Sequence, residues 1–298
     1  MEKFAFVILH YNTVDDTFNC VNSIKECCCN TDYRIYIVDN ASPNDSGKMI
    51  KEKYGLDGLV KVILSNNNLG FARGNNIGID AARNDGYSDF IIVTNSDTKI
   101  IQKDFCELIK KIFYRSSFSV LGPTIFTPKG ETFANPFNSS ITSLRELKKV
   151  QNYYKKGVYL LQTNKDYVWN MYAKMHHLKL RIIGKFKRII ANKPSVHRYT
   201  ENCILHGCCL IFSKLFFEKF NGFDPRTFLY VEEQILHAHV VHSGLKTVYD
   251  PELKIWHKED GATDSIYKEK KEKLLFLYTN ILKSLEIYKD VLESYKVC

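Results

Sequence analysis

The stretch IIVTNSDTKI, residues 91 to 100, joins an apolar run to side chains that are able to bind a cation. The run leads directly into Asn95, Ser96 and Asp97. Such residues often form a turn, because Asn, Ser and Asp side chains hydrogen-bond to nearby backbone. A carboxylate at the carboxyl end of a central strand can also hold Mg²⁺ or Mn²⁺, since open α/β sheets bind their ligands there. Asp97 therefore has two interpretations at this point, a turn and a metal site.

Three further groups of residues have side chains suited to nucleotide binding or catalysis. Asp39 ends an apolar run and suits the base or ribose of a nucleotide. Glu232 and Glu233 follow the aromatic stretch FDPRTFLY; the helix dipole explains one acid, and a general base explains the second better. His257 is either an ordinary hydrogen-bonded histidine or a second metal ligand, which would favour Mn²⁺.

The segment NNLGFARGNNIG, residues 67 to 78, suits the backbone of a phosphate-binding loop. Gly70 and Gly74 permit close approach of a ligand, and a helix is expected to start between them. The segment does not have the GxGxxG spacing, and the chain has no Walker loop. The sequence therefore argues against a dinucleotide-dependent dehydrogenase and a P-loop nucleotidase.

Short β-rich runs at residues 4–9, 33–38, 60–64 and 89–94 alternate with segments of helical character. This alternation predicts a largely parallel sheet with helices on both faces. Each run ends in polar residues, namely HYN, DNAS, SNNNLG and NSD. Because parallel strands end at one edge of the sheet, these residues should form a ligand crevice. This grouping favours a binding site over a plain turn at Asp97.

The second half of the chain has a weaker pattern. We expect a strand and turn within SVLGPTIFTPKG, a strand at 202–214, a helix at 229–244 that Gly244 closes, and a short strand in KTVYDP. Residues 255–265 are expected to form a polar loop, and the tail is expected to form a helix that docks on the body or on a membrane.

The composition of the 298 residues, 45% hydrophobic and 25% charged, is typical of a soluble globular protein. No run of 18 or more apolar residues occurs, and MEKFAFVILHYN resembles a first strand more than a signal peptide. The nine cysteines include contiguous groups without CxxC spacing, which predicts reduced thiols and a cytoplasmic protein.

Positive charge is concentrated in residues 144–198. This basic segment holds 14 Lys or Arg against Glu146 and Asp166, a net charge of +12, whereas the whole chain is +9. The segment is either a solvated helical surface or a surface for an anionic partner such as a membrane or a lipid diphosphate. Nucleic acid is the remaining alternative.

The motifs VILHYN, VDNAS, NNLGFARGNN, TNSDT, LHGCCLIFSKLFFEKFNGFDPRTFLYVEEQIL and IWHKEDGATDS together resemble family 2 glycosyltransferases of the GT-A fold. The resemblance is strongest to the rhamnosyltransferase-like enzymes of bacterial capsule and O-antigen synthesis, and it covers roughly residues 4 to 135 and 200 to 265. It implies a GT-A domain at 1–265, made of a nucleotide-sugar-binding half at 1–135, a basic helical insertion at 140–200 and an acceptor half at 200–265. A helical tail at 266–298 follows.

The resemblance also implies the roles of particular residues. The "ED" pair of the family matches Glu232 and Glu233, and Glu233 is the preferred base. The metal-binding DxD motif matches Asn95-Ser96-Asp97, where Asn replaces the first acid, so Asp97 and His257 are the expected ligands of Mn²⁺ or Mg²⁺. The nucleotide-sugar contacts are expected at Tyr11, Asn12, Asp39, Asn40, Asn68, Gly70, Phe71, Arg73, Gly74, Asn75, Asn95, Ser96, Asp97, His206 and Gly207.

The activity that follows is inverting transfer of a sugar from a UDP- or dTDP-sugar to a lipid-linked saccharide. The protein is then expected to be cytoplasmic and peripheral on the inner face of the membrane, held there through residues 144–198, with no nucleic acid bound. Two alternatives stay open, a nucleic-acid-binding protein that uses the same basic segment and a sugar-1-phosphate nucleotidyltransferase. The latter normally has a glycine-rich basic loop after the first strand, where this chain has HYNTVDD.

Overall fold

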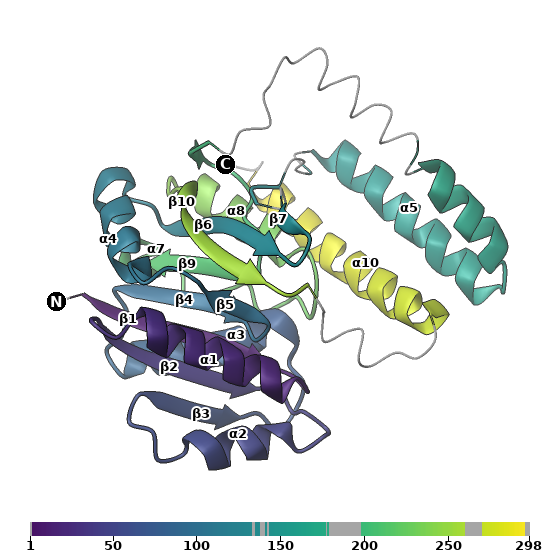
Figure 1. Cartoon of the computed structure of the whole chain (residues 1–298). Helices are drawn as coiled ribbons and strands as arrows, with labels where there is room; N and C mark the ends of the chain where they lie inside the picture. The colour runs from purple at the N-terminus through teal and green to yellow at the C-terminus, as the bar shows by residue number, and fades with distance from the viewer. Residues whose placement is uncertain are drawn as a thin grey trace.

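The computed structural model describes residues 2–132, 135–137, 141, 143–176, 178, 198–259 and 270–295. Strands and helices alternate in the N-terminal half (Figure 1). They are β1 (Lys3–His10), α1 (Val14–Cys27), β2 (Asp32–Asp39), α2 (Ser46–Tyr54), β3 (Val60–Leu64), α3 (Gly70–Asn84) and β4 (Phe90–Asn95). The strands and helices expected for this half are confirmed.

The C-terminal half has short strands and longer helices. Its elements are β5 (Thr98–Ile100), α4 (Phe105–Ser116), β6 (Val120–Thr127), β7 (Gly130–Thr132), α5 (Leu144–Gln162), β8 (Thr200–Glu201), β9 (Cys209–Ser213), α7 (Lys214–Phe217), α8 (Glu232–His242), β10 (Thr247–His257) and α10 (Lys270–Ser294). Residues 166–176, which follow α5, are also helical.

One sheet joins the two halves in the order β3-β2-β1-β4-β9-β6-β10-β5. The strands β3, β2, β1 and β4 are parallel, as predicted. The strand β9 runs antiparallel between β4 and β6, and β5 is antiparallel to β10. The predicted α/β sheet is therefore confirmed, with parallel pairing in the N-terminal half and mixed pairing beyond β4.

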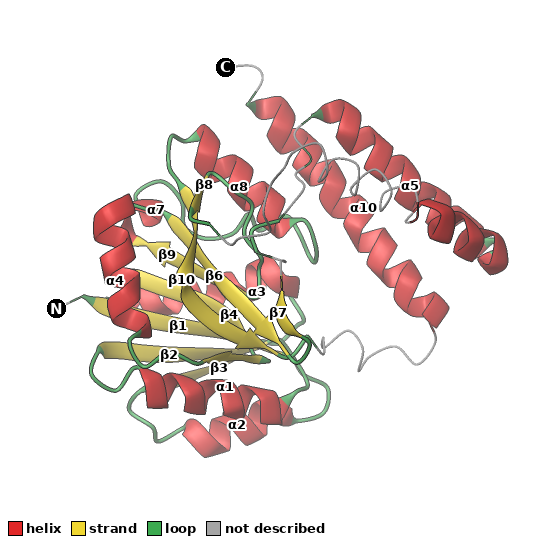
Figure 2. Cartoon of the chain, turned by 45° about the horizontal axis from the view of Figure 1, so that its top comes forward, coloured by secondary structure: helices red, strands yellow, loops and turns green. Residues whose placement is uncertain are grey.

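Alternate side chains of β1 enter the cores on opposite faces of the sheet. Phe4, Phe6 and Ile8 pack with α1, α2 and α4, whereas Ala5 and Val7 pack with α3 and α8. Figure 2 shows these helices covering the two faces. A strand that is buried on both faces needs an unbroken apolar sequence, which explains why FAFVIL contains no polar residue.

A helical unit of α5, residues 166–176 and α10 lies beyond the end of the sheet at which β1, β2 and β4 finish (Figures 1 and 2). Trp169, only 1% exposed, packs with Leu160 of α5 and Tyr278 of α10. The helix α10 also packs against α8, through Leu285 and Tyr288 among others. The tail thus docks on the body, which was one of its two expected positions.

Two expected boundaries in the C-terminal half are wrong. The strand expected at 202–214 begins only at Cys209, because residues 202–208 form a loop held by contacts with distant residues. The strand expected at KTVYDP continues to His257. Pro251 cannot donate to the strand pairing, but a register shift between Tyr249 and Lys254 accommodates it and the strand resumes. His257 is therefore a strand residue, and residues 260–265 of the expected loop lie outside the described part.

The contact of α10 with α8 leads to a stability prediction. Leu285→Ala should lower the free energy of unfolding by about 2–5 kcal/mol, because it removes a buried side chain that packs against Val231 and Ile235. Urea unfolding followed by circular dichroism measures the change. The matched control is Leu56→Ala, which alters a fully exposed leucine and should stay within about 0.5 kcal/mol of the wild type. Equal effects of the two substitutions would show that α10 does not support α8.

Candidate active site

The carboxylate of Asp39 lies at the end of β2 and is held by the loop that follows. The Ser42 hydroxyl donates to its Oδ1 at 2.5 Å, and the Ser42 backbone N–H lies 3.3 Å from the same atom. His10 Nε2 is 4.0 Å away. Burial lowers the pKa of His10 to about 4, so this histidine is neutral near pH 7 and does not form a charged pair with Asp39.

A line of hydrogen bonds connects Asp39 with the loop that carries Asp97. The Ser42 hydroxyl accepts from the backbone N–H of Asn12 at 2.9 Å. The next residue, Thr13, has its hydroxyl 3.3 Å from that of Ser96. The ends of β2, β1 and β4 thus form one continuous polar rim, as the parallel strand order predicted.

The start of α3 closes one side of this rim. The Asn40 side chain accepts from the Leu69 N–H at 2.8 Å and donates to Asn68 Oδ1 at 3.0 Å. Gly70 has a φ of +76°, and a Cβ there would lie 2.1 Å from the Phe228 carbonyl oxygen. A side chain at this position would separate α3 from the segment before α8, which explains the glycine.

Asp97 pairs with His257 on the other side of the rim, with 3.1 Å between Oδ1 and Nε2. The two side chains are 10% and 11% exposed, so their polar atoms are accessible but well fixed. The antiparallel pairing of β5 with β10 places His257 opposite Thr98. Asp97 also borders a hollow of about 290 Å³, with Asp15, Asp16 and Trp256 among its other lining residues.

The Asp97 and His257 donors fit one divalent cation. Mg²⁺ and Mn²⁺ take oxygen and imidazole ligands at about 2.0–2.2 Å, so two adjacent ligands of one ion lie about 3 Å apart. The distance between these two atoms is 3.1 Å. No cluster of three or more His, Cys, Asp or Glu side chains suited to a metal occurs among the described residues. A cation bound by Asp97 and His257 would therefore need further ligands from a bound substrate or from water.

Glu233 reaches the same region through the segment at 206–208. Its Oε1 accepts from the Gly207 N–H at 3.3 Å, and a Cβ at Gly207 would lie 2.8 Å from that oxygen. The carbonyl of Cys208 accepts from the Asn95 N–H at 2.9 Å, which ties this segment to the strand before Asp97. Burial raises the pKa of Glu233, so its carboxylate is a stronger base than an exposed one.

His206 lies between Glu233 and the Asp97 pair. Its ring is 6.1 Å from that of His257, and its Nδ1 accepts from the Cys208 N–H at 3.1 Å. Burial, and then the neighbouring His257, lower the pKa of His206 to about 4. His206 is therefore neutral near pH 7, and its ring proton is on Nε2.

Glu232 has a different environment from Glu233. It is 6% exposed, and among the described residues its Oε1 has no hydrogen-bond partner. Burial, and then the charge of Glu233, raise the pKa of Glu232 from 4.5 to about 8. The structure thus separates the two acids, with Glu233 against Gly207 beside the rim and Glu232 in the protein interior.

The turn before these acids is strained. Tyr230 and Val231 both have positive φ values, 72° and 71°, which are rare for an aromatic and a β-branched residue. The Ser284 hydroxyl of α10 donates to the Leu229 carbonyl at 3.0 Å and helps to hold the turn. Strain of this kind costs about 1–3 kcal/mol per residue and persists only where surrounding packing enforces it.

The residues predicted for the site do not all share its surface. Asp39, Asp97, His257 and the half-buried Tyr11 and Asn12 line or adjoin the rim, and Ser96 contacts it. Arg73 is exposed on the first turn of α3, whereas Gly74 packs on Leu9. Asn75 is completely buried and donates to the Phe71 carbonyl at 3.0 Å, so its geometry indicates helix packing.

The sequence did not point to Thr13 or Asn135, and it placed Ser42 in a polar strand end without indicating its contact with Asp39. Thr13 and Ser42 connect the strand ends, and the buried Asn135 accepts from the His206 N–H at 3.1 Å while donating to the Pro123 carbonyl. Ser42 lies three residues after Asp39, a spacing that favours a local hydrogen bond and was a usable signal. Asn135 is 71 residues from His206, and nothing in the sequence pairs them.

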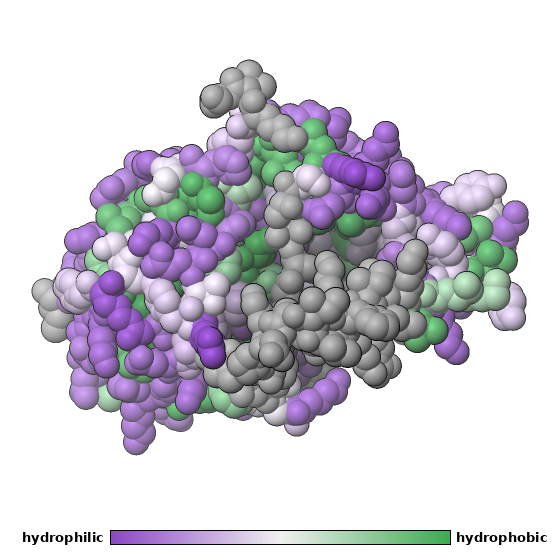
Figure 3. All heavy atoms as spheres, turned by 90° about the horizontal axis from the view of Figure 1, so that it is seen from above, coloured by the Kyte–Doolittle hydropathy of each residue, from purple (hydrophilic) through white to green (hydrophobic). Residues whose placement is uncertain are grey.

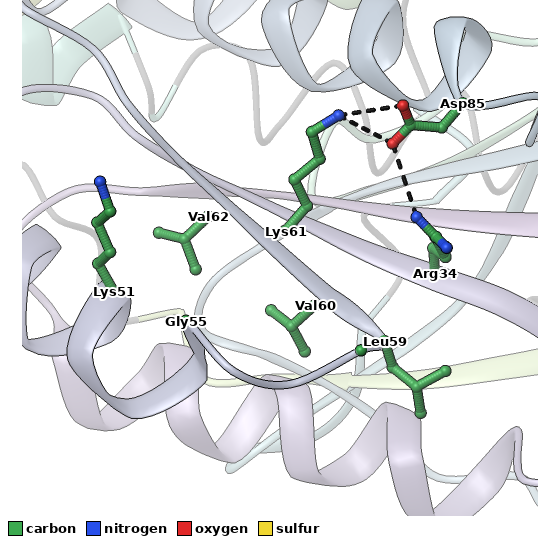
Figure 4. Close-up of a pocket in the computed structure, with 9 residues that line it drawn as sticks. Arg34, Lys51, Gly55, Leu59, Val60, Lys61, Val62 and Asp85 are labelled. Atoms are coloured by element: carbon green, nitrogen blue, oxygen red, sulfur yellow. Dashed lines mark hydrogen bonds and ion pairs between the residues drawn. The ribbon is translucent and has the colours of Figure 1, made fainter.

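A second hollow, shown in Figure 4, lies near the amino ends of β2 and β3. Its charged residues include Lys61 and Asp85, which form an ion pair at 2.9 Å, and Arg34, 3.9 Å from the same carboxylate. The strand ends that carry Asp39 lie at the other end of the sheet. The rim is therefore the candidate active site.

The sheet order and the polar rim define the GT-A fold, and solved structures share it. A crystal structure of S. aureus TarS aligns with a TM-score of 0.52 and 13% identity, covering 87% of this chain and 37% of that chain. Two structures of TarS residues 1–349, one in complex with UDP and one without, align with TM-scores of 0.51 at 13% and 14% identity. Each of these two alignments covers 94% of this chain and 71% of the TarS chain.

The chain belongs to glycosyl transferase family 2, because the model of that family matches residues 5–172, more than half of the sequence. A search of curated proteins finds no match. The matched range includes Asp39, the start of α3 and Asp97. The resemblance deduced from the motifs is therefore confirmed at the level of family and fold.

The burial of Glu232 makes stability depend on pH. Because its pKa is higher in the folded protein than in the unfolded chain, stability should fall as pH rises from about 4.5 to about 8 and then level off. Glu232→Gln removes this titration, so the variant should gain about 1–4 kcal/mol over the wild type between about pH 5 and pH 8.5. Urea unfolding at the two pH values measures the gain. Parallel pH dependence of both proteins would show that Glu232 is not buried as described.

Proposed function

We propose that the chain is an inverting glycosyltransferase that moves a sugar from a UDP- or dTDP-sugar to a lipid-linked saccharide of a bacterial surface polysaccharide. The observation that carries this proposal is the common location of Asp39, Asp97 and Glu233. Hydrogen bonds through Ser42, Asn12 and Thr13 link Asp39 to Ser96, the neighbour of Asp97, and Glu233 accepts from the Gly207 N–H.

The donor class follows from Asp39. An ionised carboxylate can only accept hydrogen bonds, and the imide N–H of uracil or thymine can donate one to it. Cytosine has an unprotonated ring nitrogen at that position and would not be bound in this way. The structure of TarS 1–349 in complex with UDP supports a uridine nucleotide as one ligand of this fold.

Asp97 and Glu233 have different roles in the proposed reaction. Asp97 and His257 would hold a divalent cation, which supplies positive charge to the leaving diphosphate. Glu233 accepts the proton of the acceptor hydroxyl as its oxygen bonds to the anomeric carbon. The bond from that carbon to the diphosphate oxygen breaks in the same step, so the configuration inverts and no sugar is attached to the enzyme.

A single metal-binding acid distinguishes this chain from the DxD pattern. Asn95 is the last residue of β4, and its backbone N–H donates to the Cys208 carbonyl. His257 therefore takes the place of a second anionic ligand in the proposed site. A neutral imidazole gives weaker electrostatic attraction than a carboxylate, so we expect moderate cation affinity until the diphosphate binds.

The proposed base is tested by two matched variants. Glu233→Gln should lower release of UDP or dTDP from a panel of nucleotide-sugars by about 10²–10⁴-fold, because it removes the proton acceptor. Affinity for the free nucleoside diphosphate should stay unchanged. Glu232→Gln is the control and should change release by less than about tenfold. A large loss in Glu232→Gln with normal release in Glu233→Gln would reverse the assignment.

A further inference from the structure

The helix of residues 166–176 carries an exposed apolar stripe. The side chains of Tyr167, Met171, Met175 and Leu178 are between 50% and 80% exposed. Their spacing of three or four residues places them on one side of a helix. At the end of the molecule where the helical unit lies, Figure 3 shows some apolar side chains among hydrophilic ones.

The other side of this helix is fixed to the protein. Trp169 and Tyr172 pack with Tyr153 of α5, with ring centroids 5.0 Å and 6.1 Å from it. Lys156 lies over the ring of Tyr172 at 3.7 Å. The helix is therefore held through one face, and its orientation leaves the apolar stripe outward. Scattered exposed apolar residues are common, but a continuous helical stripe of large ones indicates an interaction surface.

The described part of residues 144–178, which carries the stripe, is basic. Lys155 is paired with Glu286 of α10 at 3.8 Å, and Lys156 lies on the packed face over Tyr172. The exposed cationic residues in the described part of residues 144–178 are Arg145, Lys148, Lys149, Lys155, Lys156, Lys165 and Lys174. The acids in this range are Glu146 and Asp166, and Asp166 lies 3.7 Å from Lys271 of α10. An apolar stripe among lysines matches a surface that is apolar inside and anionic outside.

We propose that the helical unit docks on an anionic phospholipid bilayer, with the stripe of Tyr167, Met171, Met175 and Leu178 inserted at the level of the headgroups. Tyrosine suits that level because its ring is apolar and its hydroxyl is polar. Among the described residues, no helix combines the length and the apolar character of a transmembrane span. The unit lies beside the carboxyl ends of the strands, which would bring the candidate active site near the bilayer.

The net positive charge of residues 144–178 favours an anionic bilayer over a second copy of the chain as the partner of this surface. Two copies joined through their stripes would bring two basic surfaces together, which repels, whereas an anionic bilayer attracts them. The docking does not depend on the proposed transferase reaction. Only its purpose, access to a lipid-linked acceptor, rests on that function.

The test uses the full chain and vesicle flotation. The wild type should float with vesicles of phosphatidylcholine and phosphatidylglycerol and not with phosphatidylcholine alone. The triple variant Tyr167→Gln, Met171→Gln, Met175→Gln should bind the anionic vesicles about tenfold more weakly, because the apolar stripe is lost. The matched control is Met49→Gln, Leu56→Gln, Leu59→Gln, which alters exposed apolar residues near α2 and β3 and should float like the wild type.

Three results would overturn the proposal. They are absence of wild-type binding to anionic vesicles, equal binding of the stripe variant, and a wild-type dimer in light scattering that the stripe variant converts to a monomer without vesicle binding. Calorimetric binding of UDP and dTDP by the same variants is measured in parallel. Absence of binding of both UDP and dTDP with normal flotation would contradict the proposed function alone, and normal nucleotide binding without flotation would contradict the docking alone.

Discussion

The parallel pairing of β1 with both of its neighbours is the constraint on which the candidate site depends. The register places His10 opposite Asp39 and Leu9 opposite Asn95, so the polar residues after all three strands meet at one edge. A shift of one residue would exchange the faces of Phe6 and Val7, which lie in different cores. The packing of the two cores therefore also sets the positions of Asp39 and Asp97.

Much of the N-terminal half could be predicted from its sequence, because each strand is an apolar run bounded by polar residues. FAFVIL and DFIIVT are short enough for strands, and the helical segments between them require parallel crossovers. The strand pairing of the C-terminal half could not be predicted, because its strands pair with strands that are far away in the sequence. Nothing in CCLIFS indicates that it inserts antiparallel between β4 and β6, and the shift that carries β10 past Pro251 depends on the neighbouring strand.

The candidate site divides in the same way. Asp39 and Asp97 were identifiable because several polar strand ends of one parallel sheet meet at one edge, which a single turn does not explain. Glu233 was identifiable because the helix dipole explains one of two adjacent acids and leaves the second without a structural role. The contacts that orient them were not identifiable, since Gly207 contacts Glu233 and Thr13 contacts Ser96 only in the folded chain. The difference between Glu232 and Glu233 also comes from folding, because burial depends on the strained turn at Tyr230 and Val231 and on α10 behind it.

Calorimetric titration with UDP, dTDP, GDP and CDP, with and without Mn²⁺, measures whether the rim binds a nucleoside diphosphate together with a cation. We expect that UDP or dTDP binds, that Mn²⁺ strengthens this binding, and that Asp97→Ala abolishes the effect of Mn²⁺ while leaving weak nucleotide binding. CDP should bind more weakly than UDP, because the N3 atom of cytosine has no proton to donate to the Asp39 carboxylate. Absence of binding by all four nucleotides, or an effect of Mn²⁺ that is the same in Asp97→Ala, would contradict the account.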